Sequence, residues 1–309
     1  MPRFLLGSAI VSLIAVTSVA QPVAPQPPVI DMHVHSDATS SPQAAVAQMN
    51  SLNIRYVFLS SSAADLRLWA DAGNPSRYLP AFQFPCPAGV NPITGRSCFD
   101  SPTEFPDIAW VRDELRAGRI WAFGELVPEY LGMVPNDPRL DAYWQLAEEF
   151  DLPVAIHMGI GPPGAAYDKA SGPSKSPNFR ITAGDPRLLE DVLLKHKRLR
   201  LYVMHAGFPY FESMLALLYL HPNVYVDVGA LHATFAVPRE AYYRYLRGLV
   251  ENGFGKRIMF GSDLVFANQA LPAINAILAA DFLNSEQKAD ILCRNAQRFL
   301  RLAESICAN

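Results

Sequence analysis

The chain has 309 residues, 50% of them hydrophobic and 18% charged, which suits a folded globular protein and not a disordered or fibrous one. Lys and Arg total 26 against 29 Asp and Glu, so the formal net charge is -3. This balance offers no excess of positive charge to a polyanion, and we therefore expect no nucleic-acid partner. A small-molecule substrate is the better hypothesis.

Residues 1–20 have the pattern of a secretory signal peptide. Arg3 precedes an apolar run at residues 4–19, and the small residues Ser18 and Ala20 stand where a signal peptidase reads the chain. We expect cleavage after Ala20 and export to the periplasm or the medium, with no stable membrane insertion afterwards. The alternative is an N-terminal membrane anchor, which the shortness of the apolar run disfavours.

After a proline-rich lead-in at residues 21–28, strand and helix patterns alternate through one domain that we place at residues 29–302, with 303–309 as a C-terminal tail. Eight short apolar runs predict strands at 29–34, 56–59, 79–84, 121–127, 154–156, 201–204, 224–228 and 258–260. Apolar residues at three- and four-residue spacing predict helices between them, among them 139–150, 186–196, 211–220 and 239–251. Eight such units in about 250 residues predict an α/β fold, a single-domain (β/α)8 TIM barrel. An open doubly wound sheet is the alternative, but its glycine-rich phosphate fingerprint is missing after the first strand.

Four cysteines allow three pairings, and export would let them oxidise. The segment from Cys86 to Cys98 has the character of a loop that a disulfide could close, with Cys293 and Cys307 as a second pair. Four buried free thiols are an equally good interpretation.

One connection, residues 158–184 after the fifth predicted strand, is long and rich in Gly, Pro and Ser. On a barrel it would lie over the end that carries active sites, as a substrate-contact loop or as a mobile spacer. Its Arg180 could clamp a substrate carboxylate, although a solvated surface arginine is the plainer interpretation. His232, in the loop after the seventh strand, is a second candidate for substrate contact.

The strongest local signal for chemistry is the run Asp31, Met32, His33, Val34, His35. Strict alternation along a strand would put Asp31, His33 and His35 on one face, where the two imidazoles could chelate one metal ion. A lone H-x-H pattern is weak evidence, so the other strand ends must be considered.

Further residues of the types that bind metal ions lie at the ends of other predicted strands. Apolar runs lead to His157, to His205 and to Asp263, and the fourth strand contributes Glu125. Structural histidines could explain any one of them. Because the carboxyl ends of all strands of a parallel barrel meet at one face, the recurrence predicts a metal site there.

On these motifs the chain resembles the amidohydrolase superfamily, in particular the amidohydrolase-related branch (amidohydrolase family 2) of metal-dependent hydrolases and decarboxylases. The matching pieces are DMHVH, GEL, PVAIHMG, LYVMHAGFP, HPNVYVDVG and RIMFGSD. They run in family order across roughly residues 29 to 301 and are far more specific for the superfamily than for a reaction.

The resemblance implies that His33, His35 and Asp263 bind a divalent metal, with zinc the first expectation, and that His157 is a further ligand. In members with one ion, the histidine that corresponds to His205 orients the water on the metal. One ion is the favoured expectation for this chain.

Members with two ions place the second between the two later histidines, and a carboxylate or a carboxylated lysine bridges the pair. Residues 119–136 contain no lysine, so only Glu125 could bridge here. A structural carboxylate buried under the site is the alternative role for Glu125.

The implied enzyme is a metal-dependent hydrolase that uses a metal-activated water on an ester, lactone or amide bond of a small organic substrate. Asp263 would accept the proton of the water, and His205 would orient the nucleophile or stabilise the oxyanion. A non-oxidative decarboxylase acting on a carboxylated aromatic or unsaturated acid is the alternative, and a non-catalytic metal or ligand binder is a weaker one.

Overall fold

The computed structural model describes residues 26–36, 41–71, 77–91, 97–99, 103–167, 176–234, 236–263 and 270–308. The predicted signal peptide lies outside the described residues, as does most of the predicted lead-in. Within the described residues, no helix combines the length and the apolar character needed to cross a membrane.

Eight parallel strands form one sheet in the order β1 to β8. They are β1 Val29–His35, β2 Ile54–Ser61, β3 Tyr78–Phe84, β4 Ala122–Leu126, β5 Pro153–His157, β6 Arg200–Met204, β7 Val224–Asp227 and β8 Ile258–Met259. Hydrogen bonds from Met32 N to Phe260 O (2.9 Å) and from Asp263 N to His33 O (2.8 Å) join β1 to the segment after β8. The predicted (β/α)8 barrel is confirmed, and every predicted strand overlaps an observed one.

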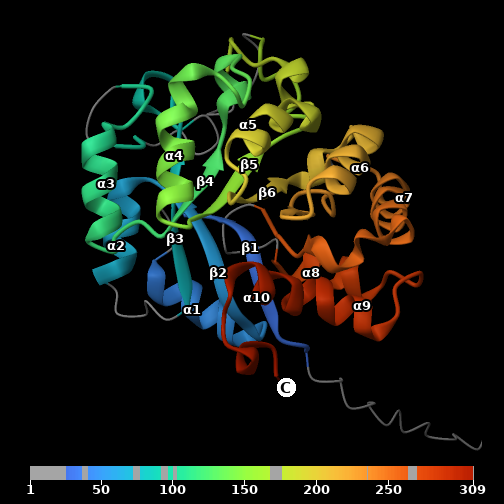
Figure 1. Cartoon of the computed structure of the whole chain (residues 1–309). Coiled ribbons are helices and arrows are strands. Elements are labelled where there is room, and N and C mark those ends of the chain that lie inside the picture. The colour runs from blue at the N-terminus through green and yellow to red at the C-terminus, as the bar shows by residue number, and fades with distance from the viewer. Residues whose placement is uncertain are drawn as a thin grey trace, which may run out of the picture.

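Helices surround the strands, as Figure 1 shows. They are α1 Pro42–Ser51, α2 Ala63–Asp71, α3 Ile108–Arg116, α4 Asp141–Glu149, α5 Glu190–Lys195, α6 Phe211–Leu220, α7 Arg239–Leu249, α8 Ala270–Leu278, α9 Ser285–Ala289 and α10 Asn295–Leu300. Sequence signals set several helix starts. Ser41 caps α1 ahead of a proline, Asp107 caps α3, and Asn284 forms a capping box with Gln287 at α9.

Two apolar clusters hold the barrel together. The larger one fills the space between strands and helices, and a smaller one fills the barrel interior with residues such as Phe58 and Tyr202. Phe299 of α10 packs against Tyr202 with ring centroids 5.5 Å apart. Burying each such side chain contributes about 1.5–3 kcal/mol. The apolar filling leaves polar side chains to the carboxyl ends of the strands.

The alternation expected along β1 is interrupted, and one expectation was therefore wrong. The pairing of β1 with β2 shifts register between Asp31 and Val34. As a result Ile30 and Met32 belong to the interior cluster, although His33 and His35 also reach the active end. Asp31 does not share their face. Its carboxylate accepts hydrogen bonds from the main-chain N–H groups of His33 (3.1 Å) and Ser262 (2.9 Å), and burial raises its pKa to about 6.

Two disulfides are present, Cys86–Cys98 and Cys293–Cys307, so the free-thiol interpretation does not hold. The second ties the C-terminal residues, which form a short 3-10 turn at Glu304–Cys307, to the segment before α10. The first closes the loop that follows β3.

Candidate metal centre

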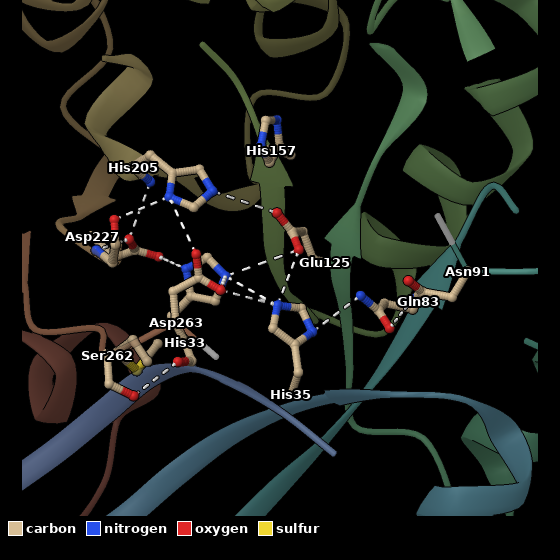
Figure 2. A network of polar contacts seen from close by, with 12 residues as sticks. His33, His35, Gln83, Asn91, Glu125, His157, His205, Asp227, Ser262 and Asp263 are labelled. Carbon is tan, nitrogen blue, oxygen red and sulfur yellow. Dashed lines mark hydrogen bonds and ion pairs between the residues drawn. The ribbon is translucent and has the colours of Figure 1, made fainter. Parts of the chain in front are cut away.

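Histidines and carboxylates from six strands gather at the carboxyl end of the barrel (Figure 2). They are His33 and His35 at the end of β1, Glu125 on β4, His157 ending β5, His205 just after β6, Asp227 ending β7 and Asp263 after β8. All except Asp263 are buried, and the Asp263 side chain is 14% exposed. The structure thus brings together all the predicted ligand residues.

Three ligand atoms of this cluster lie at the spacing of a coordination shell, and an oxygen of Glu125 lies beside two of them. The Nε2 atoms of His33 and His35 are 3.3 Å apart, and Asp263 Oδ1 lies 3.3 Å from the first and 3.4 Å from the second. Glu125 Oε2 lies 3.2 Å from His35 Nε2 and 3.9 Å from His33 Nε2. Zinc bonds of about 2.0–2.1 Å in a tetrahedron place neighbouring ligands roughly 3.3–3.4 Å apart. His33, His35 and Asp263 therefore fit one divalent ion.

The second carboxylate oxygen of Glu125 faces a second group of potential metal-ligating residues. Glu125 Oε1 lies 3.6 Å from His205 Nε2, and the rings of His157 and His205 have centroids 4.7 Å apart. Glu125, His157 and His205 form a further candidate ligand group. A carboxylate that presents one oxygen to each group has the arrangement of a bridge between two ions.

Each histidine of the cluster has its Nδ1 atom beside an oxygen or an amide, which leaves Nε2 toward the centre. The neighbours are Asp227 Oδ2 for His33 (3.1 Å), Gln83 for His35 (3.3 Å), Glu129 for His157 and the carbonyl of Gly229 for His205 (3.0 Å). At His35 the neighbouring atom is the amide nitrogen of Gln83, which is a donor. At His33, His157 and His205 the neighbour is an oxygen that can accept from Nδ1, which leaves Nε2 unprotonated in the form that binds a metal. Such support is what a metal centre requires.

The cluster also concentrates negative charge, which protonated imidazoles or a bound cation can balance. Burial alone would lower the pKa of His35, but contacts with Asp263 and Glu125 raise it to about 9. Burial likewise opposes the change at His205, where Glu125 and Asp263 raise the pKa to about 10. Burial would raise the pKa of Asp263, but the neighbouring histidines bring it below its ordinary range. The carboxylates are thus ionised, and positive charge must balance them.

Two residues of the cluster are held in left-handed backbone conformations that non-glycine residues rarely adopt. The φ angles are 55° at His205 and 50° at Asp263. Asp227 accepts a hydrogen bond from His205 N (3.1 Å), and Asp263 N donates to His33 O (2.8 Å). Such strain persists where surrounding contacts enforce it, as they do here, and it aims both side chains inward.

Sequence reasoning missed Asp227 and Glu129. Asp227 ends an apolar strand, just as His157 does, so the same rule could have found it. Glu129 has no such signal, because it lies beyond β4 in a 3-10 turn at Pro128–Leu131. Its buried carboxylate contacts His157, and burial raises its pKa.

Neither of the two predicted substrate contacts belongs to the candidate ligand groups found among the described residues. Arg180 is exposed, and its guanidinium donates to the carbonyls of Pro177 (3.2 Å) and Phe179 (2.8 Å). His232 is buried after β7 and belongs to none of the ligand groups found among the described residues. A role of Arg180 or His232 in substrate binding stays a prediction.

The connection after β5 does reach the cluster in its described part. The ring of Tyr130 stands between Phe179 and His157, with centroid distances of 5.2 and 5.3 Å. Part of this connection therefore lies beside the candidate centre, where a substrate-contact loop was expected.

A family model described as "Amidohydrolase" matches residues 108–302, more than half of the chain. The chain belongs to this amidohydrolase family. The family is one of metal-dependent enzymes, so this amidohydrolase is an enzyme, and the predicted family resemblance is confirmed. No curated protein matches it.

Solved structures share the fold at low sequence identity. 5-Carboxyvanillate decarboxylase from Sphingomonas paucimobilis is 14% identical, with a TM-score of 0.59, and the match covers 89% of this amidohydrolase and 99% of the other chain. A probable 2-pyrone-4,6-dicarboxylic acid hydrolase from Acinetobacter baumannii, with citric acid bound, is 15% identical with a TM-score of 0.57 and coverages of 89% and 99%. 5-Carboxyvanillate decarboxylase from Novosphingobium aromaticivorans, with bound manganese, is 13% identical with a TM-score of 0.59 and coverages of 89% and 97%.

Proposed function

We propose that this amidohydrolase is a metal-dependent hydrolase that attacks an ester, lactone or amide bond of a small organic substrate with a metal-activated water. The observation that carries the proposal is the spacing of three ligand atoms, from His33, His35 and Asp263, at 3.3–3.4 Å from one another, with Glu125 Oε2 3.2 Å from His35 Nε2. A divalent ion held there would acidify water and polarise a carbonyl oxygen.

Asp263 is the residue best placed to move the proton. Its Oδ1 atom faces His33 and His35, while its Oδ2 atom lies 3.9 Å from His205 Nδ1. Its lowered pKa keeps the carboxylate ionised at neutral pH, so it can accept a proton from water. Because its side chain is partly exposed, unlike that of Glu125, it can return that proton to the leaving group.

His205 has a role that depends on the number of ions. With one ion, its ring would orient the attacking water, held in place by the carbonyl of Gly229. With two, it would be a ligand of the second ion together with His157. The placement of the two Glu125 oxygens toward both groups favours two ions over the one ion expected from the resemblance.

Zinc remains the proposed metal, because a site rich in imidazole suits it. The bound manganese of one structural neighbour keeps that ion as the main competitor. Elemental analysis of protein loaded with each metal, followed by activity measurement, distinguishes them.

Decarboxylation is the second candidate function, and the raised pKa of His205 supports it because a protonated imidazole could protonate a departing carbanion. The experiment is turnover of metal-loaded protein on esters, lactones, amides and carboxylated aromatic acids. We expect hydrolysis products. Release of carbon dioxide from an aromatic acid, with no hydrolysis anywhere in the panel, would replace the hydrolase by a decarboxylase.

We also propose that the protein is exported after cleavage at Ala20. Two disulfides support this, since such bonds persist in oxidising compartments. N-terminal sequencing of the protein from its own host should begin at Gln21. Recovery of intact Met1 on a membrane-bound product would contradict the proposal.

A further inference from the structure

A pocket of about 380 Å³ lies at the end of the barrel opposite the candidate metal centre. Residues near the starts of strands border it, among them Leu79 of β3, Pro153 of β5 and Arg200 of β6. The candidate ligands lie at or beyond the carboxyl ends of the strands, and none of them borders this pocket. We call it the base pocket, and the proposed chemistry does not use it.

The wall of the base pocket is mostly apolar. Tyr56 and Leu79 belong to the interior cluster. Leu300, the last residue of α10, and Leu302 just after it pack against the same cluster, and Phe150 between α4 and β5 adds an aromatic ring. Sites for small organic ligands have this volume and this character, an apolar cavity with a few placed polar groups.

Trp121, just before β4, brings a large aromatic ring to the pocket, and it is 55% exposed. It is held at two points. Its Nε1 atom donates to Gly118 O (2.6 Å), and its main-chain N–H donates to Pro80 O (3.0 Å). A tryptophan that is fixed in place yet half exposed offers apolar surface to a flat partner.

Tyr56 supplies a polar group deep in the pocket. It is 8% exposed, and burial alone raises the pKa of its hydroxyl to about 12, so the hydroxyl stays protonated. The buried hydroxyls of Tyr78, Tyr202 and Tyr245 each donate to a main-chain carbonyl, but the described residues supply no such partner to Tyr56. A buried hydroxyl without a partner is costly, and a ligand that bears a hydroxyl group would satisfy it.

The charged residues of the base pocket leave an excess of positive charge. The Asp151 carboxylate is shared by two guanidinium groups, because Oδ1 lies 2.9 Å from Arg200 Nε and Oδ2 forms an ion pair with Arg301. Arg116 lies 3.7 Å from Asp113, and both of these side chains are mostly exposed, so this pair is weak. Three guanidinium groups thus face two carboxylates. Guanidinium groups bind a carboxylate ligand well.

We propose that the base pocket binds an aromatic carboxylic acid that carries a hydroxyl group at the far end of its ring. The ring lies against Trp121 and Phe150, the hydroxyl group bonds to Tyr56, and the carboxylate faces Arg116 and Arg200. The proposal does not rest on the metal centre.

The test measures binding of 6-hydroxy-2-naphthoate to the full chain by equilibrium dialysis, with zinc added and after treatment with a chelator. We expect one molecule to bind per chain with a dissociation constant of about 1 mM or lower, equal under both conditions. The same acid without its hydroxyl group, 2-naphthoate, and the neutral 6-hydroxy-2-naphthamide should both bind more weakly.

Three variants locate the ligand. Tyr56→Phe should weaken binding of the hydroxylated acid about 2- to 10-fold and leave 2-naphthoate unaffected. Trp121→Ala should weaken both acids about tenfold, and Arg116→Gln should weaken both about 2- to 5-fold. Tyr219→Ala is the matched control, because it removes a ring that is 81% exposed on α6 and does not line the pocket. It should bind both acids as the wild type does.

Wild-type affinity for both acids in Tyr56→Phe and Trp121→Ala would overturn the proposal. If Trp121→Ala failed to fold, Tyr56→Phe alone would decide, since it removes a single oxygen atom. Binding that required zinc would place the ligand at the metal centre and overturn the base pocket as its site. Equal affinity for the amide and the acid would overturn the assignment of a carboxylate ligand.

Discussion

Replacing Asp227 by Asn and by Ala should separate two roles of one buried carboxylate. Its Oδ1 atom accepts hydrogen bonds from the main-chain N–H groups of His205 (3.1 Å) and Gly229 (2.7 Å). Its Oδ2 atom lies 3.1 Å from His33 Nδ1. One oxygen holds the backbone, and the other sets the tautomer of a ligand.

The two substitutions have different costs. In Asp227→Ala both main-chain donors lose their acceptor, and each buried donor left unpaired costs about 1–3 kcal/mol, so the variant should lose roughly 2–6 kcal/mol of stability. In Asp227→Asn the remaining oxygen can still accept both. Its NH2 group then faces His33 Nδ1 and favours the ring form with Nε2 protonated. Metal affinity should fall about 10- to 100-fold with little loss of stability.

Thermal unfolding of metal-free protein measures the first effect, and chelator competition with zinc measures the second. The two readouts should move independently, stability in the Ala variant alone and affinity in both. An Asn variant with wild-type zinc affinity would refute the claim that Asp227 fixes the tautomer of His33.

Three further outcomes are expected. The metal content of two variants gives the number of bound ions. If two ions bind, both His157→Ala and His205→Ala should lower the metal content toward one ion per chain, whereas if one ion binds, His205→Ala should keep its metal and lose catalytic rate. Full metal content with full activity in His205→Ala would contradict both schemes. Because the pKa of His35 is raised to about 9, the metal-free ring is protonated at neutral pH. Zinc loading at pH 7 should therefore release protons, and the apparent zinc affinity should rise with pH up to about pH 9. Calorimetry in buffers of different ionisation enthalpy measures the proton release, and a pH-independent affinity would contradict this prediction. In Gly184→Ala the new Cβ would clash with Glu129 Oε2 and with the main-chain O and N atoms of Gly159 (2.5 and 2.8 Å), so the carboxylate and the backbone must both shift. Thermal unfolding should show a loss of about 1–3 kcal/mol, and unchanged stability would contradict this tight packing around Gly184.

The barrel and most of the candidate ligands could be predicted from the order of residues alone. Apolar runs of strand length alternate with helical periodicity, and burial of those runs leaves few other arrangements. His157 and Asp263 could be named because a polar ligand type directly after a buried strand has one place to go in a parallel barrel, the common carboxyl end.

The orientation of the ligands and the contacts that support them depend on how distant segments pack. The register shift in β1 separates Asp31 from His33, which alternation alone could not foresee, because it depends on pairing with β2. His33 and Asp227 are 194 residues apart in the chain, and Glu129 reaches His157 from a turn beyond β4. The sequence around each histidine does not show which distant group bonds to its ring. That partner is set by which segments the folded barrel brings within about 3 Å of the ring nitrogen.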